Sequence, residues 1–523
     1  MQNKLFLCTI PKNGVNTPSL ALGYLQGACK EKGIDVELRD FNYDLWEGTI
    51  HTEWWEIWKE SNVDLYKGDN FHKFVHSVYN DYLDKWAQEI ANNDAEWIGI
   101  SCFSYRSLPS LKLLSPRIRK LAPNKKIIVG GAPIATYAKW IIDNNLADYA
   151  VMSEGDVVLP KIILGEISPG IVQTQQIDDL NSLPPADYTG LDFKKYIPGD
   201  PGGLRVHHNP KWTSDRVEAG IMGSRGCVRK CTFCDVEAYW PKFRWRSAES
   251  VYAEMEKLLD QGINEVYFYD SLINGNQQEF EKLLDIIILN GSKFRSIKGL
   301  AIFKSQPERL YEKMQKANVK QLSIGVESFS EEMRTQMRKK FSNATMDQNL
   351  DLYKKYKINV VLLMVIGYPS ERERHHKENL TWIEAHKHMA NGLPISRIEI
   401  GGTMLILPGA PVFKNHMFDY YIDENNEWVT KNGTEVNTMD VRVRRREETE
   451  NECRKYGFMT GSVYGDGGIV LGDHEKNNAA DYKRPQDNLI PLSNINELNF
   501  EEDDMDTLVG WESDPSRPNH QNL

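Results

Sequence analysis

Two series of short apolar stretches, each separated by amphipathic segments, run along the chain. In the first series the stretch 17–33 (TPSLALGYLQGACKEKG) has helical periodicity and ends at a glycine. Around it lie apolar stretches that predict strands at 4–10, 34–42, 97–105, 125–135 and 148–156. Strands that alternate with helices predict a doubly wound, Rossmann-like parallel sheet. Such sheets bind ligands beyond the carboxyl ends of their strands, where SCFSYRS (101–107) and GGAPIA (130–135) lie.

The second series follows LNSLPPADYTGL (180–191), whose prolines and turn residues are typical of a linker. Amphipathic helices separate its strands; one of them, 247–262, opens on a serine N-cap. The predicted strands are 218–224, 264–270, 298–303, 320–326, 358–367 and 395–407. Six β-α units predict an open, partial (β/α)6 barrel, since a complete barrel has eight.

The fold class is therefore α/β, with a doubly wound N-terminal sheet, a partial barrel and a C-terminal extension. The polar end of the chain contains EEDDMD (501–506), an acidic run typical of a solvated tail. We expect a first domain over 1–180, a linker over 181–215, the barrel over 216–415, a capping region over 416–470 and a polar tail over 471–523.

Composition and charge exclude several classes of protein. The 523 residues are 41% hydrophobic and 26% charged, without an apolar run of 18, so we expect a soluble protein with no membrane span. The first apolar stretch is too short for a signal peptide. The net charge of −11 disfavours a general nucleic-acid-binding surface. Seven cysteines, four of them scattered, do not form a disulfide framework and indicate a reducing, cytoplasmic compartment.

The other three cysteines, Cys227, Cys231 and Cys234, lie in GSRGCVRKCTFCD with the spacing C-x-x-x-C-x-x-C, directly after the first barrel strand. Loops at this end of barrel strands carry the chemistry of the fold. Four thiolates would saturate a four-iron cluster or a structural zinc, whereas three leave one metal position open for a reaction. A zinc site completed by His207 or His208 is an alternative, as are three buried structural thiols, but no second cysteine pair is present.

This motif, with an aromatic residue before its last cysteine and a six-unit barrel around it, resembles the radical S-adenosylmethionine (SAM) superfamily. The resemblance implies a [4Fe–4S] cluster on the three cysteines, with SAM chelating the fourth iron. It further implies a 5′-deoxyadenosyl radical that abstracts hydrogen from a substrate, with an electron donor such as flavodoxin or ferredoxin. The cofactors carry this chemistry and the protein positions them.

Further stretches match the superfamily in order: RWRSAESVYAEME, VYFYDSLINGN, LAIFKSQ, LSIGVESFS, VIGYPSERE and LILPGAPVF. By resemblance, Glu327 would bind the ribose of SAM and Gly367 would lie beside its adenine. The methionyl end and the cluster edge would be approached by Phe233, Asp270, Asn274, Lys304 and Ser328. Lys304 stands where the family usually has arginine and offers a point charge in place of a bidentate fork. No catalytic residue can be assigned.

The first domain resembles the cobalamin-binding domains that precede some radical SAM barrels. The likeness is carried by GISCFSYRS, IVGGAPIA and SEGD, the last being similar to a G-E-G-E element. It implies a corrin beside Gly130 and Gly131, with Tyr105 and Arg106 nearby. The D-x-H-x-x-G motif that supplies a lower cobalt ligand is missing, because the first loop reads TIPKNGVNTPS. Cobalamin, if bound, would then carry no histidine from this loop.

These likenesses favour a cobalamin-dependent methyltransferase that acts on an unactivated carbon or phosphorus centre of a small molecule or peptide. Alternatives are a radical SAM enzyme without cobalamin or one that catalyses a rearrangement or cyclisation. A methylthiotransferase would need a second cluster, for which Cys8, Cys29 and Cys102 are the candidates, although core packing explains Cys8 and Cys29 better. A non-catalytic iron–sulfur or zinc scaffold is a further alternative. Cys453 and the arginine run 444–446 indicate no particular substrate.

Overall fold

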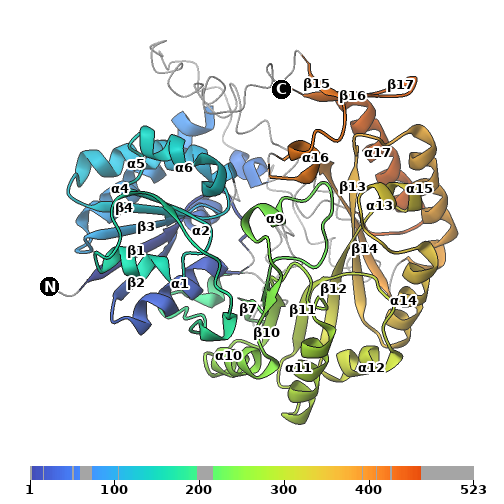
Figure 1. Ribbon diagram of the computed structural model, residues 1–523, viewed down its shortest axis with the longest axis horizontal. Helices are drawn as coiled ribbons and strands as arrows, with labels where there is room; N and C mark the ends of the chain where they lie inside the picture. The colour runs from blue at the N-terminus through green and yellow to red at the C-terminus, as the bar shows by residue number, and fades with distance from the viewer. Residues whose placement is uncertain are drawn as a thin grey trace.

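Two α/β domains lie side by side in the computed structural model, with the N-terminal domain in blue to cyan and the barrel in green to orange (Figure 1). The structure describes residues 3–460, except 16, 50–51, 59–72, 104, 197–215, 391–392, 408 and 424–426. The predicted tail and most of the predicted linker, including His207 and His208, thus lie outside the described residues. Within the described ranges, no helix combines the length and the apolar character needed to cross a bilayer.

The N-terminal domain is built on six parallel strands in the order β2-β1-β3-β4-β5-β6. The five strands expected from the sequence are present, and a sixth, β6, extends the sheet at its edge. Their bounds are β1 Lys4–Thr9, β2 Asp35–Asp40, β3 Trp97–Ser101, β4 Lys126–Gly130, β5 Tyr149–Met152 and β6 Gly170–Gln173.

Successive side chains of β1 point to opposite faces of this sheet and are all apolar from Leu5 to Cys8, so helices must cover both faces. Leu5 and Leu7 enter one apolar cluster with α1 and α7, while Phe6 and Cys8 enter the other with α2, α4, α5 and α6. This confirms the doubly wound arrangement. The helices are α1 Leu20–Glu31, α2 Phe41–Thr49, α4 Asn80–Asn92, α5 Leu108–Leu121, α6 Ile134–Asp143 and α7 Val158–Ile163.

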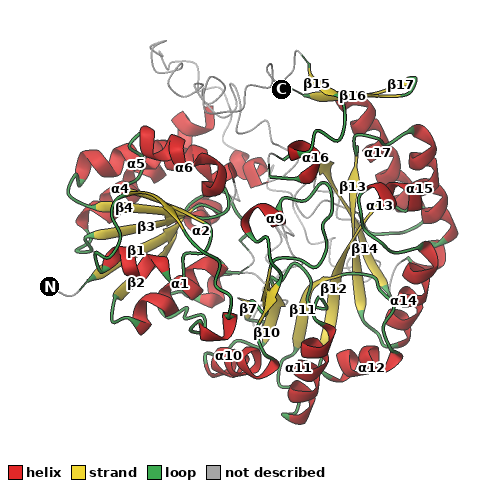
Figure 2. Cartoon of the chain, viewed as in Figure 1, coloured by secondary structure: helices red, strands yellow, loops and turns green. Residues whose placement is uncertain are grey.

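The second domain has six parallel strands in the order β14-β13-β12-β11-β10-β7, as an open barrel requires. This confirms the predicted partial barrel. Its strands are β7 Glu218–Ile221, β10 Glu265–Phe268, β11 Ser296–Ala301, β12 Val319–Glu327, β13 Asn359–Ile366 and β14 Ile395–Thr403. The helices on the outer face are α10 Ala248–Asp260, α11 Gln277–Leu289, α12 Glu308–Lys316, α14 Asn343–Lys355 and α15 Glu373–Ala385 (Figure 2).

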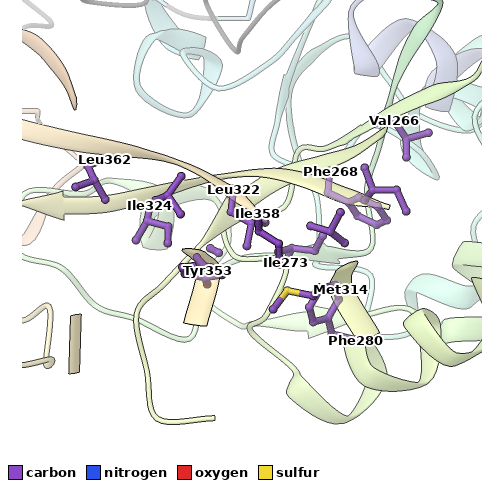
Figure 3. Close-up of a cluster of buried hydrophobic side chains, with 14 of the residues drawn as sticks. Val266, Phe268, Ile273, Phe280, Met314, Leu322, Ile324, Tyr353, Ile358 and Leu362 are labelled. Carbon is purple, nitrogen blue, oxygen red and sulfur yellow. The ribbon is translucent and has the colours of Figure 1, made fainter. Parts of the chain in front are cut away.

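Burial of apolar residues between strands and helices holds the barrel together. Phe268, Leu322 and Leu362 on the strands meet Phe280, Met314 and other helix residues in one continuous core (Figure 3). Helix α10 begins as the sequence predicts, because Ser247 Oγ accepts a hydrogen bond from Ser250 N at 3.2 Å.

The C-terminal region supplies the sixth helix of the barrel. Helix α17, Met439–Lys455, packs against β14 and α15. Between β14 and α17 lie α16 (Pro411–Lys414) and a small antiparallel sheet of β15 (Tyr420–Ile422), β16 (Trp428–Asn432) and β17 (Glu435–Asn437). Runs of like charge usually face solvent, but Arg445 in the middle of the arginine run 444–446 is buried.

The segment between the domains is packed tightly where it is described. Asp187 N donates to Gly23 O at 2.9 Å, and Tyr188 is buried in the barrel core. The domains also meet directly, since Tyr24 Oη donates to Glu254 Oε1 at 2.8 Å. Helix α1 of the first domain is thereby joined both to the linking segment and to helix α10 of the barrel.

Candidate active site

The three motif cysteines lie in a loop closed at its base by a short antiparallel ribbon. Strand β8, Ser224–Arg225, pairs with β9, Arg244–Trp245, and the loop 226–243 between them carries all three thiols and the short helix α9, Val236–Tyr239. Gly226 has φ +84°, and a Cβ on it would lie 2.4 Å from Lys242 O. A glycine is therefore required where the two ends of the loop approach each other.

Contacts with the barrel fix the position of this loop. Thr232 N donates to Met337 O at 3.2 Å, and its hydroxyl lies 2.7 Å from Tyr368 Oη. Thr232 O in turn accepts from Val412 N at 2.8 Å. Residues that follow β12, β13 and β14 thus converge on the cysteine loop at the carboxyl ends of the strands.

The three motif thiols do not form a compact single-ion site. Among the described residues, one group of three possible metal ligands has its ligand atoms all within 4.8 Å of one another, and it consists of Glu373, His376 and Glu448. The thiols of Cys227, Cys231 and Cys234 are therefore spread more widely than this. One tetrahedral zinc would draw its ligands closer than that. Burial raises the pKa of all three thiols, that of Cys234 to about 12, so binding iron would release their protons.

Glu327 and Lys339 form a buried ion pair beside the cysteines. Glu327 ends β12 with φ +66°, a left-handed conformation that is uncommon for a non-glycine residue and is often found at functional sites. Its Oε1 lies 2.8 Å from Lys339 Nζ, which also lies 5.9 Å from the centre of the Phe233 ring. Burial alone would lower the pKa of Lys339, but the charges of Glu327 and Cys231 raise it.

The structure thus brings Phe233, Glu327 and Cys231 together around Lys339, while the cofactor contacts expected of them stay predictions. Sequence reasoning missed this lysine because it lies in the basic run RKK (338–340), and such runs usually face solvent. Its spacing of twelve residues from Glu327 is a weak signal, since only the fold shows that the chain turns back after α13, Glu331–Gln336.

Asp270, Asn274 and Lys304 lie near the carboxyl ends of β10 and β11, but hydrogen bonds within the protein engage them. The Asp270 carboxylate accepts from Gly223 N at 2.9 Å and from the Ser224 hydroxyl, and burial raises its pKa to about 6. Asn274 pairs with both backbone groups of Ile302, at 3.0 and 3.2 Å. These two side chains organise the loops of the site, and their contact with SAM stays a prediction.

Lys304 and Ser328 are also engaged. Lys304 Nζ donates to Asn274 O at 2.5 Å, and burial lowers its pKa, as does the nearby charge of Arg229 from the cysteine loop. Lys304 therefore lies near that loop. Ser328 is 1% exposed and donates to Asn379 Oδ1 at 3.0 Å. Its hydroxyl stabilises the turn after β12, and a role with SAM stays a prediction.

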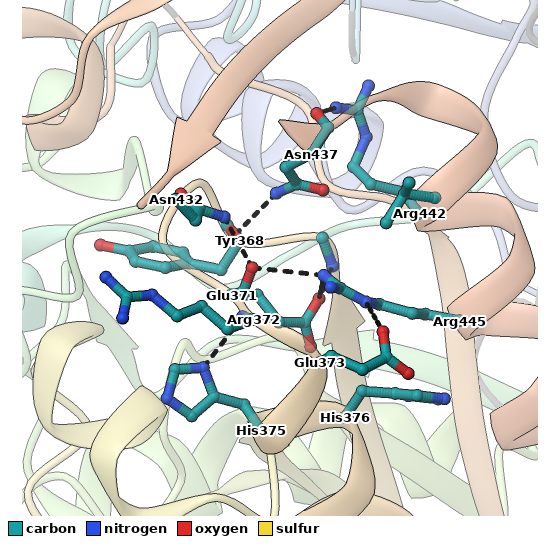
Figure 4. Close-up of polar contacts among 12 residues, drawn as sticks. Tyr368, Glu371, Arg372, Glu373, His375, His376, Asn432, Asn437, Arg442 and Arg445 are labelled. Atoms are coloured by element: carbon teal, nitrogen blue, oxygen red, sulfur yellow. Dashed lines mark hydrogen bonds and ion pairs between the residues drawn. The ribbon is translucent and has the colours of Figure 1, made fainter. Parts of the chain in front are cut away.

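The turn after β13 is held by the C-terminal region (Figure 4). Gly367 has φ +88°, and its N–H donates to Glu371 Oε2 at 2.8 Å. Asn437 Nδ2 donates to Tyr368 O at 3.2 Å, and Arg445 Nη1 lies 3.7 Å from Glu371 Oε2. Residues expected to cap the barrel therefore shape the turn expected to bind adenine.

In the first domain, Gly130 ends β4 and Gly131 follows at φ +121°. A Cβ on Gly131 would lie 1.9 Å from Cys102 O, so close packing between strands explains this glycine without a corrin. Arg106 lies in the turn Tyr105–Ser107 after β3, and the side chain of Tyr105 lies outside the described residues. Contacts of these four residues with cobalamin stay predictions.

Two apolar side chains that follow strands of the same sheet are exposed. Phe103, directly after β3, is 60% exposed, and Val157, after β5, is 43% exposed. In the first loop, Lys12 Nζ donates to Ile57 O at 2.6 Å and no histidine is present. A cobalamin bound at this edge would therefore receive no histidine from the first loop.

The N-terminal cysteines are arranged differently. Cys8 and Cys102 lie in the apolar cluster on one face of the sheet, and Cys29 lies in the cluster on the opposite face. Burial raises the pKa of each thiol. The three cannot hold one cluster together and serve as core packing.

Two family models match the chain. The "Radical SAM superfamily" model matches residues 221–383 and the "B12 binding domain" model matches residues 10–163. The first range lies within the barrel and the second within the N-terminal domain.

Curated relatives are distant. The ribosomal protein uS12 methylthiotransferase RimO of Clostridium botulinum is 23% identical over 250 residues, which cover 42% of this chain and 56% of the relative. The cytidylyl-2-hydroxyethylphosphonate methyltransferase of Streptomyces wedmorensis is 24% identical over 408 residues, 69% of this chain and 70% of the relative. The chain spans little more than half the length of the first of these relatives.

Solved structures share the fold. The radical SAM methyltransferase TsrM from Kitasatospora setae, with cobalamin and a [4Fe–4S] cluster bound, has a TM-score of 0.57 at 14% identity and covers 79% of this chain and 74% of its own. The cobalamin-dependent radical SAM enzyme OxsB, with aqua-cobalamin and SAM bound, has a TM-score of 0.55 at 15% identity, and the match covers 86% of this chain and 66% of the OxsB chain. With its cysteine loop, its six-stranded barrel and its preceding B12-binding domain, the chain belongs to the cobalamin-binding-domain-containing group of the radical SAM superfamily.

Proposed function

We propose that the protein is a cobalamin-dependent radical SAM methyltransferase that methylates an unactivated carbon or phosphorus centre. The observation that carries the proposal is the convergence of the cysteine loop, Glu327 and Lys339 at the carboxyl end of a barrel that is docked to a B12-binding domain. In such enzymes the cluster and SAM supply a 5′-deoxyadenosyl radical, and cobalamin supplies the methyl group.

The residues of the chain would bind and orient these groups. Cys227, Cys231 and Cys234 would hold three irons and leave the fourth for SAM. Glu327 would accept hydrogen bonds from the ribose hydroxyls, and Lys339 would release its present pairing to face a carboxylate. Burial of both groups strengthens these contacts by excluding water. Phe103 and Val157 would support the corrin from the edge of the first sheet.

A methylthiotransferase is the main alternative, since RimO is among the relatives. It is disfavoured because Cys29 lies on the opposite face of the sheet from Cys8 and Cys102. A cobalamin-free enzyme, or one catalysing a rearrangement, remains the other alternative. The substrate we propose is a small molecule or peptide, the electron donor a flavodoxin or ferredoxin, and the compartment the cytoplasm.

Anaerobic reconstitution tests the cluster assignment. Four irons per chain are expected in the wild type, and Cys227→Ala, Cys231→Ala or Cys234→Ala should each abolish the cluster. Matched controls are Cys8→Ala, Cys29→Ala and Cys453→Ala, which change buried thiols elsewhere and should leave the iron content unaltered. An equal loss of iron in the controls would contradict the assignment and favour a second cluster.

Added hydroxocobalamin tests the second half of the proposal. The wild type should retain a corrin absorption band after desalting, and the Co(II) form should give an EPR spectrum without nitrogen splitting. Protein that cleaves SAM to 5′-deoxyadenosine but retains no corrin would overturn methyl transfer from cobalamin and leave a cobalamin-free radical enzyme.

A further inference from the structure

The base of the cysteine loop has an unusual pairing of charges. In the ribbon of β8 and β9, Arg225 lies directly opposite Arg244. Like charges at directly opposite positions of an antiparallel pair repel each other and destabilise the pair. Both side chains are also buried, each 6% exposed, so water screens this repulsion poorly. The ribbon that closes the loop therefore needs negative charge from elsewhere in the protein.

Two carboxylates of the B12-binding domain supply it. Glu154 and Asp156 belong to SEGD (153–156), which follows β5. Asp156 binds Arg225 in a bidentate pair with both distances 2.8 Å, and Glu154 binds Arg244 in another at 2.7 and 2.9 Å. Glu154 Oε1 also lies 3.3 Å from Arg225 Nη1 and thus links the two arginines. Bidentate pairs fix geometry as well as charge.

The carboxylates are themselves fixed in place. Glu154 and Asp156 have side chains 2% and 7% exposed, and Ile177 N donates to Glu154 Oε2 at 2.7 Å. Ser153, directly before them, has φ +101°, which is uncommon for a residue with a Cβ. The segment is held in a strained conformation that points both acids at the ribbon.

We propose that Glu154 and Asp156 are positioning residues that hold the base of the cysteine loop closed, so that seating of the iron–sulfur cluster depends on the B12-binding domain. Their partners are Arg225 and Arg244 of the barrel, and the role assigned to them needs no contact with the corrin. The proposal rests on the cluster assignment above, but it does not depend on methyl transfer or on bound cobalamin.

The chain offers a matched control for this effect. Asp178, also in the N-terminal domain, pairs with Lys242 of the same cysteine loop at 3.5 Å, but these side chains are 82% and 69% exposed. An exposed pair contributes little, because water screens it and both side chains are mobile. Asp178→Asn therefore removes an interdomain charge pair with the loop without disturbing the buried network.

The test compares Glu154→Gln and Asp156→Asn with Asp178→Asn and the wild type. In cluster-free protein, amide exchange of residues 223–246 should be at least tenfold faster in the first two variants. In reconstituted protein, iron loss to a chelator should be at least tenfold faster. The affinity for hydroxocobalamin should stay within twofold of the wild type, and Asp178→Asn should match the wild type throughout.

A double variant guards against a general folding defect. In Glu154→Gln/Arg244→Gln neither partner is left as an unpaired buried charge, so iron loss should be slower than in Glu154→Gln alone. Iron retention equal to the wild type in Glu154→Gln, or loss of hydroxocobalamin binding with retained iron, would overturn the proposal. If the wild type takes up no iron, the proposed function fails, and the amide exchange of 223–246 still decides whether Glu154 and Asp156 hold the base of the loop closed.

Discussion

Replacement of Gly367 by alanine tests how the C-terminal region shapes the turn after β13. An added Cβ would lie 2.3 Å from Arg442 Cδ and 2.7 Å from its Cγ. Arg442 cannot easily move away. It is fully buried, its guanidinium lies 3.7 Å from the centre of the Trp428 ring, and it donates to Trp428 O at 2.8 Å and Asn437 O at 3.1 Å.

Two effects set the expected magnitude. Gly367 has φ +88°, and an L-residue in the left-handed region costs roughly 1–2 kcal/mol. Overpacking against a side chain that cannot shift costs about 1–3 kcal/mol more. Gly367→Ala should therefore lower the free energy of unfolding by roughly 2–5 kcal/mol.

Chemical denaturation of the variants measures these terms separately. Gly262→Ala is the control, because Gly262 has φ +82° but no atom within 4 Å of its Cβ position. It should show the backbone term alone. In an Arg442→Ala background, the effect of Gly367→Ala should fall close to that smaller value, since only the Cβ of residue 442, at 3.2 Å, stays near the added methyl group. Because the turn must shift to admit the methyl group, the affinity for SAM should weaken more in Gly367→Ala than in the control.

Equal destabilisation by Gly367→Ala and Gly262→Ala would refute this reasoning. It would mean that Arg442 moves freely, and that the C-terminal region does not constrain the turn.

Two further predictions concern buried charges. Glu327→Ala should leave the iron content unchanged but weaken SAM binding by roughly 1.5–3 kcal/mol, which is what hydrogen bonds to a charged group contribute. Titration calorimetry measures this affinity, and an unchanged affinity would contradict the placement of Glu327 at the ribose. Burial raises the pKa of the Glu371 carboxyl to about 7 from an ordinary 4.5, so the folded chain binds the carboxyl proton more tightly than the unfolded chain does. The free energy of unfolding should therefore fall by up to about 3 kcal/mol as the pH rises from about 4.5 to 7. Glu371→Gln should lack this loss of stability when melting temperatures are measured between pH 5 and 8. The same dependence of melting temperature on pH in the variant and the wild type would contradict the raised pKa of Glu371.

Local sequence patterns determined most of the architecture. Apolar stretches of strand length predicted five strands of the first sheet and all six of the barrel, because burial on both faces of a parallel sheet leaves a continuous apolar run. The cysteine spacing predicted the cluster loop, since three ligands in eight positions need no distant contact. The predicted strands missed β6, whose short stretch GIVQ is largely exposed at the sheet edge and carries little pattern.

Glu327 was expected at the site from the sequence, but tertiary structure alone showed which further charged residues are buried in and around it. Lys339, Arg442, Glu154 and Asp156 lie in segments whose composition is typical of exposed loops and helix faces. Asp156 and Arg225 are 69 residues apart, and Glu154 and Arg244 are 90. A buried charge is stable only with a partner of opposite sign, and that partner is brought close by packing of the two domains. Because such pairs depend on three-dimensional proximity, periodicity and spacing along the chain could not show them.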